Sequence, residues 1–441
     1  MAVIAGTTSC DDFLDREPMS SISPETYYST AAQLEANLND EYPNVLPSFG
    51  QWTYGIFGED KGTDNQIEVN ANDRYTQDRW KVPHSESDNW KFERIYRINF
   101  FLSEALPKFG EDMSGSQNTI SGSVATIKHY IGEMYFLRAY EYFKKLQLFG
   151  DFPIINQPLA DEMEALREAS KRFPRNEVAR FILEDLDKAI SYLASRGKFN
   201  GQRVNREAAL LFKSRVALFE ATFEKYHKGS GRVPGDNNWP GANMPYNSGK
   251  NFSIDSEVDF FLTEAMNAAK QVADNAQLTT NNHVIEPQPG VITGWNDYFE
   301  MYSQPSLANV PEVLLWKQYS FSLSISHDAA YRVKTGCADG YTRTFAESFL
   351  MKNGLPIYAS NDYQGDVSID NVKAGRDERL QLFVWSESTL LDSDPSAPQY
   401  SQPFKKPGID NSNQEIRCIT GYQPRKYYTY DYTQTPNDEL R

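Results

Sequence analysis

The sequence predicts a mainly helical fold, an array of helical pairs that carries long irregular segments. Between about residues 85 and 276, apolar side chains recur at helical spacing in successive windows. Small residues recur in these windows at positions where neighbouring helices pack closely. From residue 277 onward Pro, Gly, Asn, Asp and aromatic residues dominate. We therefore expect a helical array at about 85–276 and an irregular, ligand-facing region at about 277–441.

The first expected helix runs from Pro24 to Leu38, with Ser23 as N-cap and Pro24 at the first helical position. Apolar periodicity then predicts the helices of the array at Asn89–Leu106, Ser123–Phe149, Asn176–Ala194, Asn205–Tyr226 (capped by Asn205) and Ser256–Asn275. The second of these is apolar on more than one face, so neighbouring helices must cover it on several sides.

The irregular region contains three further expected elements. A short helix at Thr344–Lys352 ends before Gly354, and strand-like runs occur at Glu312–Tyr319 and Leu380–Trp385. Within the array, Ala139 and Phe143 have the spacing of tetratricopeptide helices. The helical part therefore fits a degenerate tetratricopeptide-like array with long insertions.

Composition limits the classes of partner. The net charge of −16 repels phosphate backbones and argues against nucleic-acid binding. No apolar run approaches the ~20 residues that a membrane-spanning helix needs.

Cys10 is the informative cysteine of the three in the chain. It follows a short apolar stub, residues 2–5, and a small polar run, which is typical of the site where a lipoprotein signal peptide is cut and the thiol acylated. The stub is shorter than a complete signal sequence, so we interpret residues 1–10 as a truncated remnant of one. The alternative is an ordinary free cysteine in a frayed terminus.

Motifs for catalysis are absent from the sequence: it has no HExxH, GxSxG, P-loop or dinucleotide fingerprint. The five histidines lack metal-ligand spacing. The acidic loops Glu59–Asp64 and Asn70–Asp73 carry ligands that suit a structural calcium ion but lack a regular loop spacing, so we expect solvated acids and no cofactor. Glu133 and Arg138 fall in the long helix, where we expect a charged pair to hold helix packing together.

Several collinear segments resemble the SusD/RagB family of outer-membrane glycan-binding lipoproteins. They are CDDFLDREP, WKFERIYRINFFL, IGEMYFLRAYEYFKKLQLFGDFPII, ILEDLDKAISYL, SFLMKNGLPI, GRDERLQLFV and PRKYY. The resemblance implies a single SusD-like domain over 11–441, lipid attachment at Cys10 and exposure at the cell surface. The family continues past PRKYY into a further helix, so this sequence is expected to be incomplete at its C-terminus.

The resemblance also implies a function in nutrient uptake. The expected role is to bind an oligosaccharide or polysaccharide and deliver it to a SusC-type TonB-dependent transporter, without catalysis. Two alternatives stay open: an all-helical glycan-degrading enzyme, and a tetratricopeptide-type adaptor that binds a protein or peptide.

Carbohydrate recognition directs attention to aromatic residues in loops, where a flat ring can pack against the C–H face of a sugar. The candidate ligand-binding residues are Trp52, Tyr54, Trp80, Trp239, Tyr246 and Trp295. We expect two or three of them to contact ligand and the others to pack. Trp295 has helical spacing to Phe299 and is the one expected first in the core.

Overall fold

The computed structural model describes residues 27–50, 55–68, 76–77, 89–110, 112–336, 339–397 and 400–434. These residues form two compact units. The first, which we call the helical unit, falls within 1–46, 88–196 and 204–274, and the second, the loop unit, falls within 47–87, 197–203 and 275–441. The prediction of a mainly helical fold is confirmed for the described residues.

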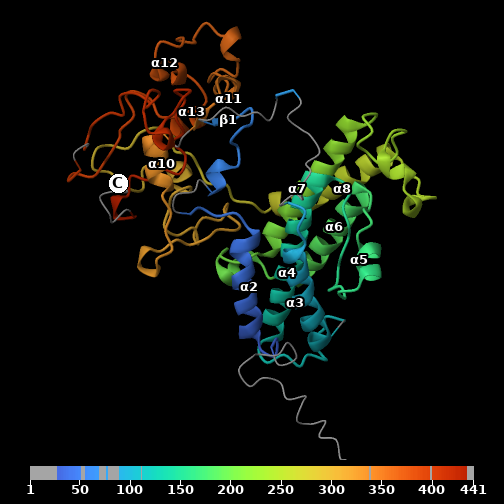
Figure 1. The fold of residues 1–441 in the computed structure, drawn as a ribbon. Helices are drawn as coiled ribbons and strands as arrows, with labels where there is room; N and C mark the ends of the chain where they lie inside the picture. Colours follow the sequence, from blue (N-terminus) through green and yellow to red (C-terminus); the bar gives the residue numbers. More distant parts are fainter. Residues whose placement is uncertain are drawn as a thin grey trace, which may run out of the picture. The chain divides into compact units, whose positions relative to one another are not determined.

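The helical unit is a stack of helices that pack against one another (Figure 1). Its helices are α2 (Ala31–Val45), α3 (Glu93–Phe109), α4 (Val124–Phe149), the short α5 (Met163–Ala169), α6 (Arg175–Tyr192), α7 (Arg206–His227) and α8 (Ile254–Ala273). Helix α4 contacts α2, α3 and α6, and the contacts continue from α6 to α7 and from α7 to α8. Buried side chains occupy every face of α4, which confirms that neighbours cover it on several sides.

Local hydrogen bonds set the ends of these helices. Asn205 caps α7 as predicted, because its side chain accepts a hydrogen bond of 3.0 Å from the backbone N–H of Ala208. Helix α2 begins later than predicted, at Ala31, because Thr30 and Gln33 form a reciprocal capping box there. The predicted cap Ser23 and first residue Pro24 lie outside the described residues.

Buried charges in the helical unit pair differently from the prediction. Arg138 does not pair with Glu133: its Nε and Nη2 donate to Asp185 of α6 at 2.7 and 2.8 Å. Glu133 instead lies 2.8 Å from Nε2 of His129. Because Nδ1 of His129 accepts a hydrogen bond from the Ala194 N–H, Nε2 is the protonated nitrogen. The Arg138–Asp185 pair joins α4 to α6, which is the packing role expected of the charged residues, whereas the His129–Glu133 pair lies within α4.

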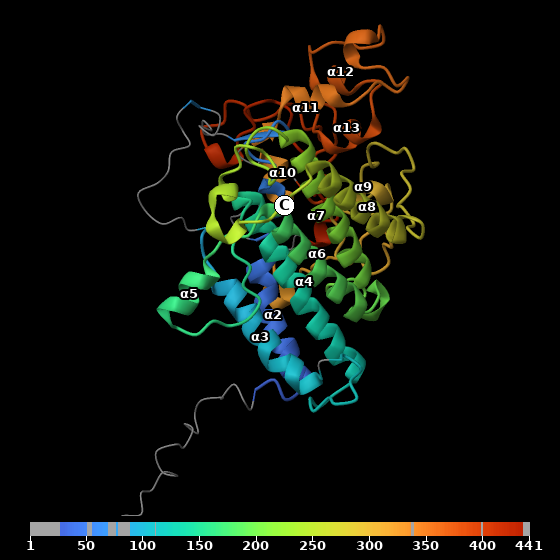
Figure 2. The same cartoon turned by 90° about the vertical axis from the view of Figure 1, so that its right-hand side faces the viewer.

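The loop unit contains short elements joined by long irregular segments. Its helices are α9 (Asp297–Glu300), α10 (Ala329–Thr335), α11 (Arg343–Ser348), α12 (Ile369–Lys373) and α13 (Glu378–Phe383). The strands β1 (Gln66–Glu68) and β2 (Asp339–Tyr341) pair antiparallel, with Ile67 opposite Gly340. Figure 2 shows α11, α12 and α13 grouped together.

The two predicted strands of this region are wrong, and the predicted helix is present but ends early. The Leu380–Trp385 run is helical up to Phe383, because Asp377 caps α13, and only Val384 then forms a single bridge with Pro424. The Glu312–Tyr319 run pairs with no other strand, and the backbone N–H of Trp316 donates to the Gly201 carbonyl. Helix α11 ends at Ser348, four residues before the predicted end, because Met351 pairs with Arg376.

Aromatic rings around a buried arginine form the core of the loop unit. The Arg425 guanidinium is fully buried and donates to both Glu286 oxygens, at 2.9 and 2.8 Å, and to the Tyr430 hydroxyl at 2.6 Å. The rings of Trp295, Phe299, Trp385 and Tyr430 lie within 4.9–5.8 Å of its central carbon. Arg425 is the arginine of the PRKYY segment, so that segment is a structural anchor.

Candidate functional site

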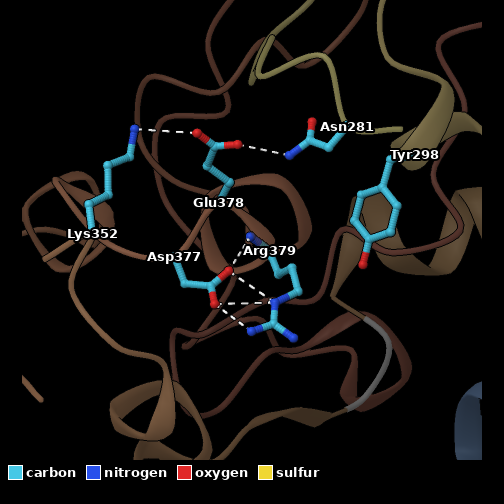
Figure 3. Close-up of a pocket in the computed structure, with 6 residues that line it drawn as sticks. All are labelled: Asn281, Tyr298, Lys352, Asp377, Glu378 and Arg379. Carbon is cyan, nitrogen blue, oxygen red and sulfur yellow. Dashed lines mark hydrogen bonds and ion pairs between the residues drawn. The ribbon is translucent and has the colours of Figure 1, made fainter. Parts of the chain in front are cut away.

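An open hollow of about 490 Å³ lies on the loop unit (Figure 3). It is lined by one aromatic and five polar residues: Asn281, Tyr298, Lys352, Asp377, Glu378 and Arg379. Small-molecule pockets are usually lined mostly by apolar side chains. This predominantly polar lining therefore suits a ligand that carries many hydrogen-bonding groups.

The turn that leads into α13 positions three of these residues. Gly375 has φ +67°, a left-handed conformation that favours glycine. The chain on either side pairs with the segment after α11, since the Asp377 N–H donates to the Leu350 carbonyl and the Lys352 N–H to the Gly375 carbonyl. This pairing places Lys352 beside the start of α13.

The side chain of Arg376 holds the same turn in place. Its side chain is buried, and Nη2 donates at 2.6 Å to the carbonyls of Ala346 and Phe349 at the end of α11. These carbonyls have no partner within their own helix, so the guanidinium satisfies them. The neighbouring Asp377, Glu378 and Arg379 are therefore displayed from a rigid support.

Asp377 and Arg379 form a forked ion pair. The Arg379 Nε lies 3.0 and 3.2 Å from the two carboxylate oxygens, and its Nη2 donates to Oδ2 at 2.5 Å. The Arg379 backbone N–H also donates to Oδ1 at 2.9 Å. Hydrogen bonds from Arg379 lower the pKa of Asp377, and the same contacts raise the pKa of Arg379. Both groups are ionised at neutral pH.

Glu378 contacts three residues from two segments of the chain. Its Oε2 lies 2.8 Å from Nδ1 of His283 and accepts a hydrogen bond of 2.8 Å from Nδ2 of Asn281. Its Oε1 lies 3.4 Å from the Lys352 ammonium. The His283 contact, followed by that of Lys352, lowers the pKa of Glu378, so this carboxylate is also ionised.

Tyr298 lies on α9, across the hollow from this charged group (Figure 3). Its ring packs edge-on against Phe383 of α13, with centroids 5.8 Å apart, and against Tyr302 at 6.2 Å. Phe383 itself stacks on Phe299 of the aromatic core. The tyrosine is thus a half-buried ring on a packed foundation.

The residues predicted from sequence fall in several places. Trp239 is buried, and its indole N–H donates to Asp151 Oδ2 at 2.9 Å, so the structure gives it a packing role. Trp295 is also buried, 4.7 Å from Phe299, where its helical spacing led us to expect it. Tyr246 is exposed on the 3₁₀ turn Pro245–Asn247 of the helical unit. Trp52, Tyr54, Trp80 and Cys10 lie outside the described residues.

The six residues that line the hollow were not among the ligand-binding residues predicted from the sequence. Lys352 lies in SFLMKNGLPI, and Asp377, Glu378 and Arg379 lie in GRDERLQLFV, two of the segments that carry the family resemblance. The signal available was a run of charged residues between a turn glycine and an apolar stretch. Tyr298 lies three residues from the predicted Trp295.

The described part of the chain has neither a metal-binding cluster nor a membrane-spanning helix. No group of three or more His, Cys, Asp or Glu side chains there has a geometry that holds a metal ion, and Asn70–Asp73 lies outside that part. Within the same residues, no helix has the length and apolar character needed to cross a bilayer.

Comparison with known proteins agrees with the fold. Residues 12–218 match the model of a SusD-like family described as "Starch-binding associating with outer membrane". The SusD-like proteins P2 and P25 of Formosa agariphila are 26% and 24% identical over 228 and 234 residues. A SusD-like carbohydrate-binding protein of Bacteroides fragilis superposes with a TM-score of 0.58 at 15% identity, covering 92% of this chain and 69% of that one. Residues 12–218 of the chain are therefore similar to the SusD-like family.

A second SusD-like structure from Bacteroides fragilis has a TM-score of 0.57 at 17% identity and covers 95% of this chain and 72% of that one. At these identities the two structures support the fold of this chain. Each of the two sequence matches covers 49% of this chain and 41% of the relative, so the chain spans about two fifths of the length of the curated relatives it matches.

Proposed function

We propose that this chain binds a glycan in the hollow between Tyr298 and the start of α13. The observation that carries the proposal is the placing of one supported aromatic ring beside five polar side chains in an open hollow. Sugar rings offer an apolar C–H face to the tyrosine and hydroxyl groups to the amide, carboxylate and cationic groups. The name of the similar Bacteroides fragilis protein, a carbohydrate-binding protein, supports the same reading.

The polar groups are held in place before a ligand arrives. Asn281, Asp377 and Glu378 each have their position set by hydrogen bonds to neighbouring segments. Groups fixed in this way lose little conformational entropy on binding. The hollow is nonetheless shallow, and water must leave the hydroxyls of the sugar, so we expect modest affinity for a single sugar and tighter binding of a chain.

The protonation states favour binding over hydrolysis. A glycosidase needs one carboxylic acid whose pKa is raised, so that it can protonate the leaving oxygen. Here the neighbours of Asp377 and Glu378 lower the pKa of both groups. The two acids of the hollow are therefore suited to accept hydrogen bonds from hydroxyls and unsuited to act as a general acid.

The wider role rests on the family. We infer that Cys10 is acylated, that the protein is held at the cell surface and that it passes glycan to a SusC-type TonB-dependent transporter. The family description, which names an association with the outer membrane, supports this inference. The aromatic residues Trp52, Tyr54, Trp80 and Tyr246 remain proposed ligand contacts in addition to Tyr298.

The binding proposal is tested by affinity electrophoresis of the protein from Asp11 onward through gels that contain plant, algal and host polysaccharides, with a parallel reducing-sugar assay. We expect retardation by at least one polysaccharide and no sugar release. Release of reducing sugar would establish the enzyme alternative. Binding of no glycan would contradict the proposal and favour a protein or peptide adaptor.

The anchor is tested separately in a Gram-negative host that expresses the full-length protein. Metabolic labelling with an alkyne fatty acid is expected to label the wild-type protein and not Cys10→Ser. Equal labelling of both would contradict acylation at Cys10. Co-purification with a TonB-dependent transporter tests the partner.

A further inference from the structure

The charged side chains around the hollow differ in exposure. The side chains of Asp377 and Glu378 are 22% and 20% exposed, whereas those of Arg379 and Lys352 are 62% and 59% exposed. The carboxylates are thus recessed and the cations project. A ligand that enters the hollow meets the positive groups first.

The hydrogen-bonding capacity of the two kinds of group differs in the same sense. Asp377 is engaged by the Nε, Nη2 and backbone N–H of Arg379, and Glu378 by Asn281, His283 and Lys352. Among the described residues, Nη1 of Arg379 has no partner. The Lys352 ammonium has one ion pair, at 3.4 Å, and an ammonium has three donors. The hydrogen-bond donors that are still available to a ligand therefore belong to Arg379 and Lys352.

We propose, on the basis of the glycan-binding function above, that the hollow selects sugars that carry an anionic group. The group is either the carboxylate of a uronic acid or a sulfate ester, and both chemistries accept hydrogen bonds from Nη1 of Arg379 and Nζ of Lys352. The sugar ring packs on Tyr298 while its anionic substituent reaches these donors. Charge-assisted hydrogen bonds of this kind are roughly twice as strong as neutral ones.

The selection is local and does not depend on the charge of the whole chain. The net charge is −16, which repels an anionic polymer at long range. At physiological ionic strength exposed charges are largely screened beyond ~8 Å, so a bound sugar experiences mainly the charged groups of the hollow, of which the two cations project. Salt is expected to weaken binding of the anionic sugar and to leave binding of a neutral sugar almost unchanged.

Titration calorimetry on matched oligosaccharide pairs tests the proposal. Each pair consists of an anionic sugar and its neutralised form: uronic-acid oligosaccharides with their methyl esters, and sulfated oligosaccharides with their desulfated forms. We expect at least one anionic oligosaccharide to bind about tenfold more tightly than its neutralised form, or better. The uronate and sulfate arms show which anion is selected.

Two variants locate the effect. Lys352→Met is expected to weaken binding of the anionic form about tenfold more than it weakens binding of the neutral form. Lys406→Met removes a cation from an exposed position outside the hollow and is expected to change neither affinity. Circular dichroism checks that both variants fold.

Equal or tighter binding of the neutral forms would overturn the selection for anionic sugars and would leave the glycan-binding function intact. A preference that persists unchanged in Lys352→Met and in Arg379→Gln would overturn the assignment to these two cations. Binding of neither form of any pair, together with no retardation by any polysaccharide, would instead overturn the proposed function itself.

Discussion

Nδ2 of Asn296 donates a hydrogen bond of 2.9 Å to Oδ1 of Asn281, and this contact decides how Asn281 faces the hollow. The backbone N–H of His283, which can only donate, also lies 3.0 Å from Oδ1. Both neighbours require an acceptor at this position, so the amide nitrogen of Asn281 must point to the other side. There it donates to Glu378, 97 residues away in the sequence.

This relationship predicts the effect of Asn281→Asp. The substitution places a carboxylate oxygen against Glu378 in place of a donor, and like charges at this distance repel. We expect the pKa of Glu378 to rise and glycan affinity to fall about tenfold, with about 1 kcal/mol lost from the free energy of unfolding. Calorimetry and urea denaturation measure the two effects. Asn361→Asp, an exposed position outside the hollow, is the control, and equal affinities in the two variants would contradict the account.

The buried Arg138–Asp185 pair predicts a large loss of stability in the helical unit. Arg138→Met leaves the Asp185 carboxylate buried without its cation. Removing one partner of a buried ion pair lowers the free energy of unfolding by about 3–5 kcal/mol. The double variant Arg138→Met, Asp185→Leu is expected to recover part of this loss. Denaturation monitored by circular dichroism measures both, and additive losses in the double variant would show that the two residues do not interact.

Glu224 predicts a dependence of stability on pH. Glu224 is fully buried on α7. The nearby Glu220 already accepts hydrogen bonds from Nε and Nη2 of Arg175, at 2.8 and 2.7 Å. Burial, with the charge of Glu220 as the second cause, raises the pKa of Glu224 to about 9. Because the folded pKa lies above the unfolded value, the stabilising contribution is full below about pH 4.5 and is lost as pH rises towards 9.

Glu224→Gln removes this dependence because the amide does not titrate. Urea denaturation at pH 5, 7 and 9 is expected to show the wild-type protein losing stability relative to the variant as pH rises. Glu184→Gln, at an exposed position of α6, is the control and is expected to follow the wild-type profile. Parallel profiles for wild type and Glu224→Gln would contradict the raised pKa.

Trp239→Phe separates packing from ligand binding. The substitution keeps a ring beside Phe252 but removes the N–H that donates to Asp151, a partly buried carboxyl whose pKa is raised by burial. We expect the free energy of unfolding to fall by about 1–3 kcal/mol, because a partly buried acceptor loses a partner. Glycan affinity is expected to stay within twofold of wild type. A loss of affinity without a loss of stability would return Trp239 to the ligand-binding residues.

The long helices were predictable because their apolar residues recur at 3.6-residue spacing over four or more turns. Helix α4 was predicted from this spacing. The cap of α7 was predicted at Asn205 because it stands at the start of the apolar pattern of the helix. Short elements carry too few turns for such a pattern. The six residues of α13 contain Leu380, Leu382 and Phe383, a short apolar run that resembles a strand, and the Asp377 cap with its pairing to Leu350 favours a helix.

The site was less predictable than the fold, for a physical reason. Its residues come from three segments, and their meeting depends on contacts such as Asn281 with Glu378 that local periodicity does not encode. The choice of loop aromatics selected Trp295, three residues from Tyr298. Trp295 turns into the core against Phe299, whereas Tyr298, on the next turn, lines the hollow.

The most direct test of the central claim compares two tyrosine variants of the loop unit against the glycan that retards the wild-type protein. Tyr298→Ala removes the ring that lines the hollow, while Tyr358→Ala removes a ring that is 90% exposed outside it. Calorimetry is expected to show at least a tenfold loss of affinity for Tyr298→Ala and none for Tyr358→Ala, with both variants folded by circular dichroism. Wild-type affinity in folded Tyr298→Ala would contradict the claim that this hollow is the glycan-binding site.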